Sequence, residues 1–380
     1  MKIPTSFGSF RVLGSARELA DEQRRSIFSS RSKDFRYYEL VEESLGGQFE
    51  FRYFLLSHEA TGESAIQPFF FVNQDLVAGL PLRLRTLVER VRRFWPRFLQ
   101  LRMLMVGCAA GEGQLDHDAA WLGPALHEAI DAYLPRAGAS IILLKDFPAS
   151  YRTALGGFSR DGYARVPSMP AARLDFDFTS FEQYMTEKLG KVFRKNLRRK
   201  FKALDDAPKL EMEVVTDLTP YVEEIYPLYL QTYQRSDFKF EELNKDYFRL
   251  IGTRMPDRTR CFLWRQEGRL VAFSLCLVHG GTIYDLDVGL DYAVALDLHL
   301  YFVTWRDVIE WSLRHGIGAY HTGPLNYDPK SHLKLLLDPQ DLYARHRSAL
   351  INPFFKIAIR YLQPTRHDPI LQRFPNAHEL

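Results

Sequence analysis

A strand–helix–strand pattern occurs twice in this chain, and it restricts the fold more than any other feature of the sequence. The first copy spans residues 101–145 and the second spans 282–322. Strands are expected at 101–107, 139–145, 282–289 and 318–322, and helices at 119–134 and 297–315. A crossover of this length is right-handed and joins parallel strands. The pattern therefore predicts two related α/β halves, each a mixed sheet with helices.

Composition narrows the class of protein. The chain has 380 residues, of which 46% are hydrophobic and 26% are charged, as in a globular protein with a sizeable core. Its formal net charge of +3 does not favour a nucleic-acid binder. Cys108, Cys261 and Cys276 are far apart, which argues against a disulfide framework or a structural zinc site. Because we find no signal peptide and no membrane-spanning run, we predict a cytoplasmic, metal-free protein.

The glycine-containing stretch "MVGCAAGEG" at 105–113 follows the first strand and precedes a helix. It permits two interpretations. A nucleotide or S-adenosylmethionine loop would need an open sheet with continued strand–helix alternation, which does not follow after Pro148. The alternative is a turn in which glycine supplies positive φ angles. We favour the turn, placed where the second copy of the repeat has its own loop.

The most unusual segment is a basic helix at 191–202, which carries seven lysine and arginine residues and no acid. Apolar residues recur on one stripe at Leu189, Phe193, Leu197, Phe201 and Leu204. The helix is therefore expected to pack on the protein and to present its cations outward. A solvated face is one interpretation. The other is an anionic partner, because clustered like charges repel one another when no counter-charge is present.

The segments "FEQYMTEKLGKVFRKNLRRKFKAL" (181–204) and "TIYDLDVGLDYAVALDLHLYFVTWRDVIEWSLRHGIGAYHTGPLNYDPK" (282–330) resemble FemAB/CelD-like members of the GNAT acyltransferase superfamily. The resemblance covers about 174–335. It implies an α/β (α+β) fold with two GNAT-like mixed-sheet units in tandem, the second better matched than the first. The expected division is a divergent GNAT-like domain at 1–173, an acyltransferase domain at 174–335 and a C-terminal extension at 336–380, packed on the domains.

Transfer of an acyl group to an amine needs a base for the amine proton. In "YDLDVGLD", Asp285 and Asp287 are two residues apart, so regular alternation would place both carboxylates on one face of a strand. They are candidate catalytic residues together with His321. Each has a structural alternative, because a strand carboxylate can pair with the basic helix and a lone histidine often serves in packing or capping.

The donor would be held by the loop before the second helix, "DYAVALDL". This loop lacks the Q/R-x-x-G-x-G/A pattern of ordinary acetyl-CoA enzymes, and Asp297 is the expected N-cap of the helix. The candidate donor-binding residues are Tyr292, Ala293, Leu298 and His299. Candidate substrate-binding residues are Arg194, Asn196, Arg198, Tyr327 and Lys330, of which Tyr327 and Lys330 match a Tyr/Lys pair of the family. Loop chemistry of "GPLNYDPK" is the structural alternative for that pair.

The resemblance implies a bacterial N-acyltransferase that uses an acyl-CoA-type donor, holds no tight cofactor and acts on a small-molecule or cell-envelope amine. Two alternatives stay open. One is an aminoacyl-tRNA-dependent transferase, with tRNA as a partner. The other is a non-catalytic GNAT-like module that binds an anionic partner. DNA is not an expected partner. Two basic, aromatic segments, at 83–102 and 351–362, are compatible with peripheral contact to the inner membrane, although packed helices with a charged outer face would give the same pattern.

Overall fold

The computed structural model describes residues 2–75, 90–93, 100–202, 208–236 and 239–380. The chain forms two compact units, which we treat separately. Unit 1 contains residues 1–28, 46–168 and 340–367, and unit 2 contains residues 29–45, 169–339 and 368–380. Most of the basic, aromatic segment at 83–102 lies outside the described residues.

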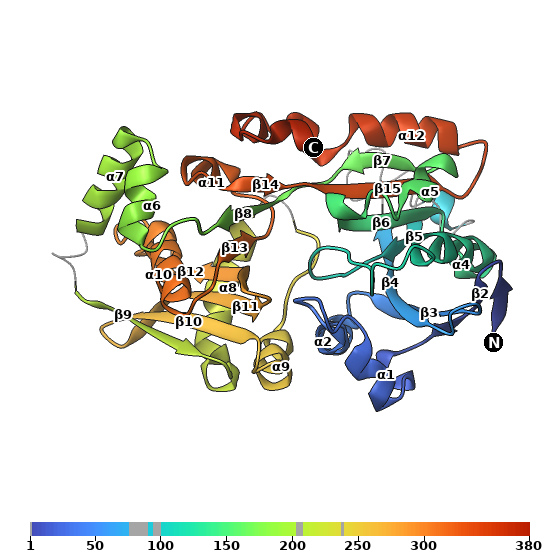
Figure 1. The fold of residues 1–380 in the computed structure, drawn as a ribbon, viewed down its shortest axis with the longest axis horizontal. Helices are drawn as coiled ribbons and strands as arrows, with labels where there is room; N and C mark the ends of the chain where they lie inside the picture. Colours follow the sequence, from blue (N-terminus) through green and yellow to red (C-terminus); the bar gives the residue numbers. More distant parts are fainter. Residues whose placement is uncertain (1, 76–89, 94–99, 203–207, 237–238) are drawn as a thin grey trace. The chain divides into compact units, whose positions relative to one another are not determined.

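Unit 1 is built on a mixed sheet in the order β1-β2-β3-β4-β5-β6-β15-β7 (Figure 1). Its described strands are β1 (Ile3–Thr5), β2 (Gly8–Leu13), β3 (Glu50–His58), β4 (Ser64–Asp75), β5 (Gln100–Val106), β6 (Ile141–Pro148), β7 (Ala164–Pro167) and β15 (Gln340–His346). Its described helices of at least five residues are α1 (Asp21–Ser26), α4 (Leu122–Ala137), α5 (Gly156–Arg160) and α12 (Asn352–Tyr361). Neighbouring strands are antiparallel except β5 and β6, which are parallel.

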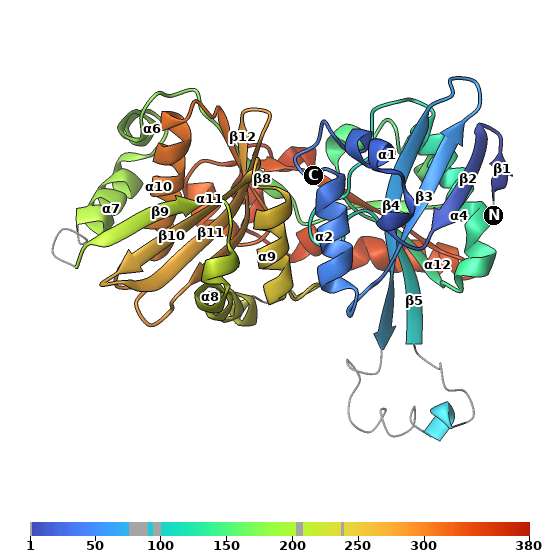
Figure 2. The same ribbon diagram turned by 90° about the horizontal axis from the view of Figure 1, so that it is seen from below.

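Unit 2 has a second mixed sheet, in the order β14-β8-β13-β12-β11-β10-β9. Its described strands are β8 (Ala171–Asp175), β9 (Leu210–Val215), β10 (Thr259–Gln266), β11 (Arg269–His279), β12 (Thr282–Leu290), β13 (Ala319–Thr322) and β14 (Leu336–Asp338). Its helices are α2 (Phe35–Leu45), α6 (Phe181–Glu187), α7 (Lys191–Lys202), α8 (Val222–Arg235), α9 (Lys245–Arg254), α10 (Leu300–Arg314) and α11 (Tyr327–His332). Helices α8 and α9 cover one face of this sheet and α10 covers the other (Figure 2).

The internal repeat is present in both sheets. In unit 1, β5 and β6 are parallel and joined through α4, and in unit 2, β12 and β13 are parallel and joined through α10. Strands β10 and β11 form a hairpin through Glu267-Gly268, and both residues have positive φ, as a tight type I′ turn requires. The predicted basic helix at 191–202 is α7. A separate helix, α6, precedes it and is capped by the Ser180 side chain, which accepts from the backbone N–H of Gln183.

Each sheet is completed by a strand from elsewhere in the chain. β15 follows β14 of unit 2 but inserts between β6 and β7 of unit 1. β8 follows β7 of unit 1 but pairs with β13 and β14 of unit 2. This organisation differs from the contiguous division expected from the sequence, because residues 29–45 belong to unit 2 and the extension at 336–380 supplies a strand to each sheet.

The glycine-rich loop at 105–113 is closely packed within unit 1. Gly107 and Gly111 have positive φ, and the backbone N–H of Gly113 donates to the carbonyl of Asp146. A Cβ on Gly113 would lie 2.5 Å from the Lys145 carbonyl oxygen, so the close approach requires glycine. Because the surrounding sheet is mixed and antiparallel on both sides of β5 and β6, the loop is a turn, and the methyltransferase interpretation is wrong.

Gly289 on β12 gives a test of the packing that holds this strand against α8. A Cβ at this position would lie 2.2 Å from Cε1 of Phe273 and 2.8 Å from the carbonyl carbon of Leu228. We expect Gly289→Ala to lower the free energy of unfolding by about 1–3 kcal/mol, because a close-packed interior cannot accept the methyl group without strain. Urea denaturation followed by circular dichroism measures this change.

Gly318→Ala is the matched control in the same unit, because its added methyl group would find its nearest atom, the Gly281 carbonyl oxygen, at 3.8 Å. Its unfolding free energy should stay within about 0.5 kcal/mol of the parent protein. Equal stability of the two variants would contradict the packing described for β12.

Candidate functional site

The candidate site is centred on β12, at the point where this strand separates from its parallel neighbour. β12 and β13 are paired from Thr282↔Ala319 to Asp285↔Thr322. β13 ends at Thr322, whereas β12 continues to Leu290 and stays paired with β11. Beyond Asp285, therefore, one edge of β12 has no partner strand among the described residues, although the backbone N–H of Leu290 donates to the Thr232 hydroxyl of α8.

An irregularity in β12 places its two carboxylates on opposite faces of the sheet. Leu275 of β11 is opposite Asp287, but its neighbour Cys276 is opposite Asp285, so Leu286 is the extra residue of a β-bulge. Directly opposite residues share a face, and Leu275 and Cys276 point to opposite faces. Asp285 and Asp287 consequently also point to opposite faces. The prediction that both lie on one face is wrong, because the bulge interrupts the alternation on which it depended.

Asp285 is the acceptor of a polar network on the face covered by α10. The Ser274 hydroxyl donates to its Oδ1 at 2.9 Å and the Tyr320 hydroxyl donates to its Oδ2 at 2.7 Å. The Cys276 thiol lies 3.9 Å from Oδ1. Burial raises the pKa of Asp285, and the hydrogen bonds from Tyr320 and Ser274 act in the opposite direction. This carboxylate is held in one orientation by donors on two neighbouring strands.

Lys330 of α11 is a cation whose charge acts on this network by lowering the pKa of Asp285. Its side chain is buried, and its Nζ donates to the Gly323 carbonyl at 2.6 Å. Burial lowers the pKa of Lys330 to about 7, and the charge of Asp285 opposes that shift. The Tyr327 hydroxyl donates to the Pro170 carbonyl at 2.8 Å, and this hydrogen bond joins α11 to the segment before β8. Of the predicted Tyr/Lys pair, the structure brings Lys330 close to a candidate catalytic carboxylate.

Asp287 lies on the opposite face, among groups from α9 and the segments before α2 and α9. The Tyr247 hydroxyl hydrogen-bonds to it and lies 3.0 Å from the hydroxyl of Tyr37. Burial raises the pKa of Asp287 to about 7; the charges of Glu241 and Asp285 add to the shift, whereas Lys33 and the Tyr247 hydrogen bond reduce it. A carboxylate with a pKa near 7 is suited to take a proton from an amine, and the charge of Glu241 helps to keep the pKa of Asp287 in that range.

His321 shares its face of the sheet with Asp287 but has its own partners. It is opposite Tyr284 in the pairing of β12 with β13, and their rings are 5.4 Å apart. Its Nε2 lies 3.0 Å from Oδ2 of Asp338. These contacts explain how the ring is held on β13, and its catalytic role stays a prediction.

The loop before α10 is organised by Asp291, which is buried. Its side chain accepts from the backbone N–H of Ala293 and pairs with Arg269. Tyr292 donates its backbone N–H to Gln231, and the guanidinium of Arg235 lies 3.9 Å above its ring. Two of the predicted donor-binding residues, Tyr292 and Ala293, are thus held by contacts within unit 2.

The helix behind this loop begins later than predicted. Residue His299, with a φ of 49°, is the N-cap, and Asp297 is not, so the N-cap prediction for Asp297 is wrong. The Leu298 side chain is buried in the core of unit 2 and so anchors the loop there. Burial lowers the pKa of His299, and the positive charges of Lys200 and Arg199 on α7 lower it further. Two cations of the basic helix α7 therefore lie near enough to the N-terminus of α10 to shift the pKa of a residue there.

Most backbone N–H groups of this loop are already engaged. The amides of 293–295, 298–300, 302 and 303 donate to oxygens within residues 291–299. Among the described residues, we find no acceptor for the amides of Leu296, Asp297 and Tyr301. A helix N-terminus ordinarily leaves four amides open to an anion. This loop consequently offers a donor phosphate few amides, and nearby cationic side chains matter more.

The other predicted residues of α7 mainly serve structure. Arg194 donates to the carbonyl of Thr186 at 2.8 Å, near the end of α6, and Arg198 pairs with Glu182. Asn196 is partly buried, and no described group donates to its Oδ1. The structure brings none of the three to Asp285 or Asp287 through a contact, and their role in substrate binding stays a prediction.

Several residues of the site could not be named from the sequence. Ser274 and Tyr320 lie on strands on either side of β12 and become partners of Asp285 through register. Glu241 precedes α9 and acts on Asp287 across unit 2. For Ser274 alone the sequence holds a signal of a polar role, because Ser274 and Cys276 interrupt an otherwise apolar strand, β11.

In the described part of the chain, no three His, Cys, Asp or Glu side chains come together in a way that would hold a metal. None of the described helices has the length and apolar character needed to cross a bilayer.

Comparison with known proteins agrees with this architecture. Residues 191–331 match the family model described as an acetyltransferase (GNAT) domain, so the chain carries an acyltransferase domain of this type. No curated protein matches the sequence. The predicted resemblance to GNAT acyltransferases is confirmed, and the matched residues lie inside the predicted range 174–335.

Three solved structures are similar to this chain over most of its length. FemX aligns with a TM-score of 0.55 at 11% identity, over 91% of this chain and all of its own. The C-terminal domain of an Agrobacterium fabrum protein assigned as a lysylphosphatidylglycerol synthetase gives 0.52 at 13%, over 91% and 97%. L-PGS from Bacillus licheniformis gives 0.51 at 14%, over 88% and 97%. At these identities the likeness shows the fold.

The raised pKa of Asp287 predicts a pH dependence of stability. Between about pH 4, where an unfolded aspartate titrates, and pH 7, the folded protein binds a proton that the unfolded chain has released. The free energy of unfolding should therefore fall across this interval, by about 1–3 kcal/mol. In Asp287→Asn this part of the slope should be absent, as measured by urea denaturation at several pH values. Glu267→Gln, in an exposed turn, should retain it; retention in Asp287→Asn would contradict the assignment.

Proposed function

Because residues 191–331 are a GNAT acetyltransferase domain, we propose that unit 2 transfers an acyl group to an amine, with Asp287 as the proton acceptor. The observation that carries this proposal is the position of Asp287 beyond the last β12–β13 pair, with a pKa of about 7. Its neighbours supply a reason for amine selectivity. Carboxylates and tyrosine rings attract an ammonium group, and Asp287, Glu241, Tyr229 and Tyr247 provide both kinds of group.

The proposed reaction is direct attack. The ammonium group of the acceptor gives a proton to Asp287, and the freed nitrogen forms a bond to the acyl carbon. The resulting tetrahedral intermediate collapses, the bond to the leaving group breaks, and the leaving group takes up the second proton released by the nitrogen. The extended edge of β12 beyond Asp285 would align the donor, since its backbone groups have no strand partner among the described residues.

We propose that Lys330, on the Asp285 side of the sheet, supplies positive charge to an intermediate held at the unpaired edge of β12, which both faces of the sheet can reach. A preorganised cation stabilises the oxyanion of an acyl-transfer intermediate, especially where water is excluded. Lys330 is buried next to the Asp285 network, and its pKa of about 7 leaves it partly protonated at neutral pH. We assign Asp285 the role of holding this charge and the end of β13 in place.

For the donor, an acyl-CoA-type thioester is the first candidate, bound as a substrate and not as a resident cofactor. Arg199 and Lys200 on α7 would contact its phosphates beside His299, and the three amides without a described acceptor would add to them. We propose a polar or cell-envelope amine as the acceptor and a bacterial, cytoplasmic setting for the reaction.

The engaged loop amides favour a second candidate, an aminoacyl-tRNA donor. A pyrophosphate cradle of backbone amides is largely closed here, whereas α7 presents exposed cations that suit a phosphodiester chain. The Agrobacterium fabrum protein of similar fold is assigned as a lysylphosphatidylglycerol synthetase, a name that points to aminoacyl transfer. In this version the ester bond to tRNA breaks in place of the thioester.

The assigned roles predict a bell-shaped dependence of kcat/KM on pH. The rate should rise as Asp287 loses its proton and fall as Lys330 loses its own, with both limbs near pH 7. Asp287→Asn should lower kcat/KM by about 10²–10⁴-fold and remove the acidic limb. Lys330→Met should remove the alkaline limb. Thiol release from acyl-CoA, or loss of the ester-linked amino acid from tRNA, measured with a panel of amines, gives these profiles.

Asp246→Asn, an exposed carboxylate on α9, is the matched control and should keep the parent rate. If Asp287→Asn and Lys330→Ala both leave the biological activity unchanged, unit 2 acts as a non-catalytic module that binds an anionic partner, and the proposal fails.

The donor site can be tested through α7. Arg199→Gln combined with Lys200→Gln should weaken donor binding by about tenfold, because two cations close to the N-terminus of α10 are lost. Thermal shift with CoA thioesters of several chain lengths reports on the first donor. Retention of aminoacyl-tRNA on filters, falling steeply with salt, reports on the second. Lys195→Gln, an exposed cation on the same helix, is the control; an equal loss in that variant would contradict a specific donor site.

A further inference from the structure

Helix α12 of unit 1 presents an apolar surface away from the sheet of unit 1. It packs along β15 and β7 (Figure 1) through one side, formed by Asn352, Phe355, Lys356 and Ile359. No residue of this helix is buried. The opposite side should carry polar residues if it met only water, because an amphipathic helix normally exposes its charged face.

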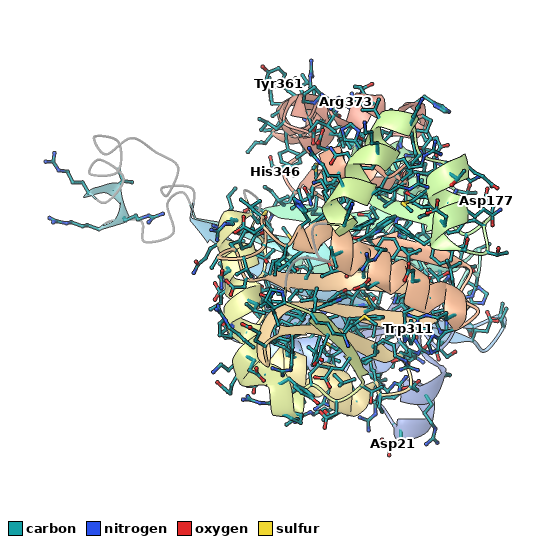
Figure 3. The ribbon with its side chains drawn as sticks, turned by 90° about the vertical axis from the view of Figure 1, so that its left-hand side faces the viewer. Asp21, Asp177, Trp311, His346, Tyr361 and Arg373 are labelled. Atoms are coloured by element: carbon teal, nitrogen blue, oxygen red, sulfur yellow. The ribbon has the colours of Figure 1, made fainter. Side chains whose placement is uncertain are left out.

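The outward side of α12 carries large apolar residues instead. Leu350, Phe354, Ile357 and Tyr361 are spaced by four, three and four residues, so they form one stripe along the helix and the turn before it. Their exposed fractions are 84% for Leu350, 73% for Phe354, 69% for Ile357 and 60% for Tyr361, with 66% for Leu362. Figure 3 shows Tyr361 at the outer surface. Six of the eight exposed large hydrophobic residues found among the described residues lie within 350–362.

The surroundings of this stripe are cationic. Residues 342–367 contain no aspartate or glutamate. Besides Arg345, this stretch carries four lysine and arginine residues that are close in sequence to the stripe, namely Arg347, Lys356, Arg360 and Arg366. Arg366 lies over the ring of Tyr361, 5.0 Å from its centroid. Within the described part of the chain none of these four forms an ion pair, whereas Arg345 on the adjacent strand pairs with Asp131.

From this arrangement we infer that α12 is a docking surface for an anionic lipid bilayer, lying in the plane of the interface. An apolar stripe a few turns long, flanked by lysine and arginine, matches a helix that inserts its apolar side between headgroups while its cations contact lipid phosphates. A protein partner with a hydrophobic groove would account for the stripe but not for the absence of acids on both sides of it. The inference is independent of the proposed transferase function, because the residues involved belong to unit 1.

Co-sedimentation of the full chain with vesicles tests the inference. Binding should occur to an equimolar mixture of phosphatidylcholine and phosphatidylglycerol, weaken at high salt and be much lower for phosphatidylcholine alone. Phe354→Ser combined with Ile357→Ser should lower the partition coefficient at least about tenfold, because two inserted side chains are lost. Arg347→Gln combined with Arg360→Gln should lower binding to the mixed vesicles about tenfold and leave the residual binding to neutral vesicles unchanged.

Ala358→Ser is the control on the same exposed side, since it removes little apolar area, and it should bind as the parent protein does. Circular dichroism checks that each variant is folded. The inference is overturned if the Phe354/Ile357 variant binds vesicles normally, or if the parent protein does not bind mixed vesicles. It is also overturned if light scattering shows self-association that disappears in that variant, because a second copy of the chain would then cover the stripe.

Discussion

The extra residue in β12 is the constraint on which the site depends. Without a bulge at Leu286, period-two alternation would place Asp285 and Asp287 on the same face, where two partly buried carboxylates would repel each other. The bulge sends them to opposite faces, so each meets different neighbours. It occurs next to the last pair between β12 and β13, so that strand separation and separation of the carboxylates coincide.

Sheet completion by strands from elsewhere in the chain fixes the domain organisation. The sheet of unit 1 needs β15, and that of unit 2 needs β8 as the link between β13 and β14. A cut at residue 173 would pass through β8, and a cut at 335 would remove β14 from unit 2. Because buried strand edges must be paired, neither half of the sequence can form its own complete sheet from contiguous residues.

Much of the fold could be predicted from regular periodicity in the sequence. The rest could not, because it depends on contacts between segments that are distant in the sequence. The β10–β11 hairpin and the order of strand, helix and strand around α10 followed from Glu267-Gly268 and from apolar spacing. The bulge at Leu286 has no glycine or proline to mark it. Likewise, the composition of "GPLNYDPK" does not show that Lys330 is buried beside Asp285, because that depends on how α11 packs.

The two units have the same order of elements around their parallel strands, but their chemistry differs. Aligned at the last pair of parallel strands, Asp285↔Thr322 corresponds to Val106↔Leu144, and Tyr320 corresponds to Ile142. Val106 and Ile142 are fully buried in an apolar core, so unit 1 has no carboxylate–tyrosine pair at this point. Its loop is also filled, since Lys145 donates to the Gly111 carbonyl and Gly113 packs against Phe147. Unit 1 therefore keeps the topology of the repeat without a counterpart of the Asp285–Tyr320 pair, and "MVGCAAGEG" is the closed counterpart of the loop before α10.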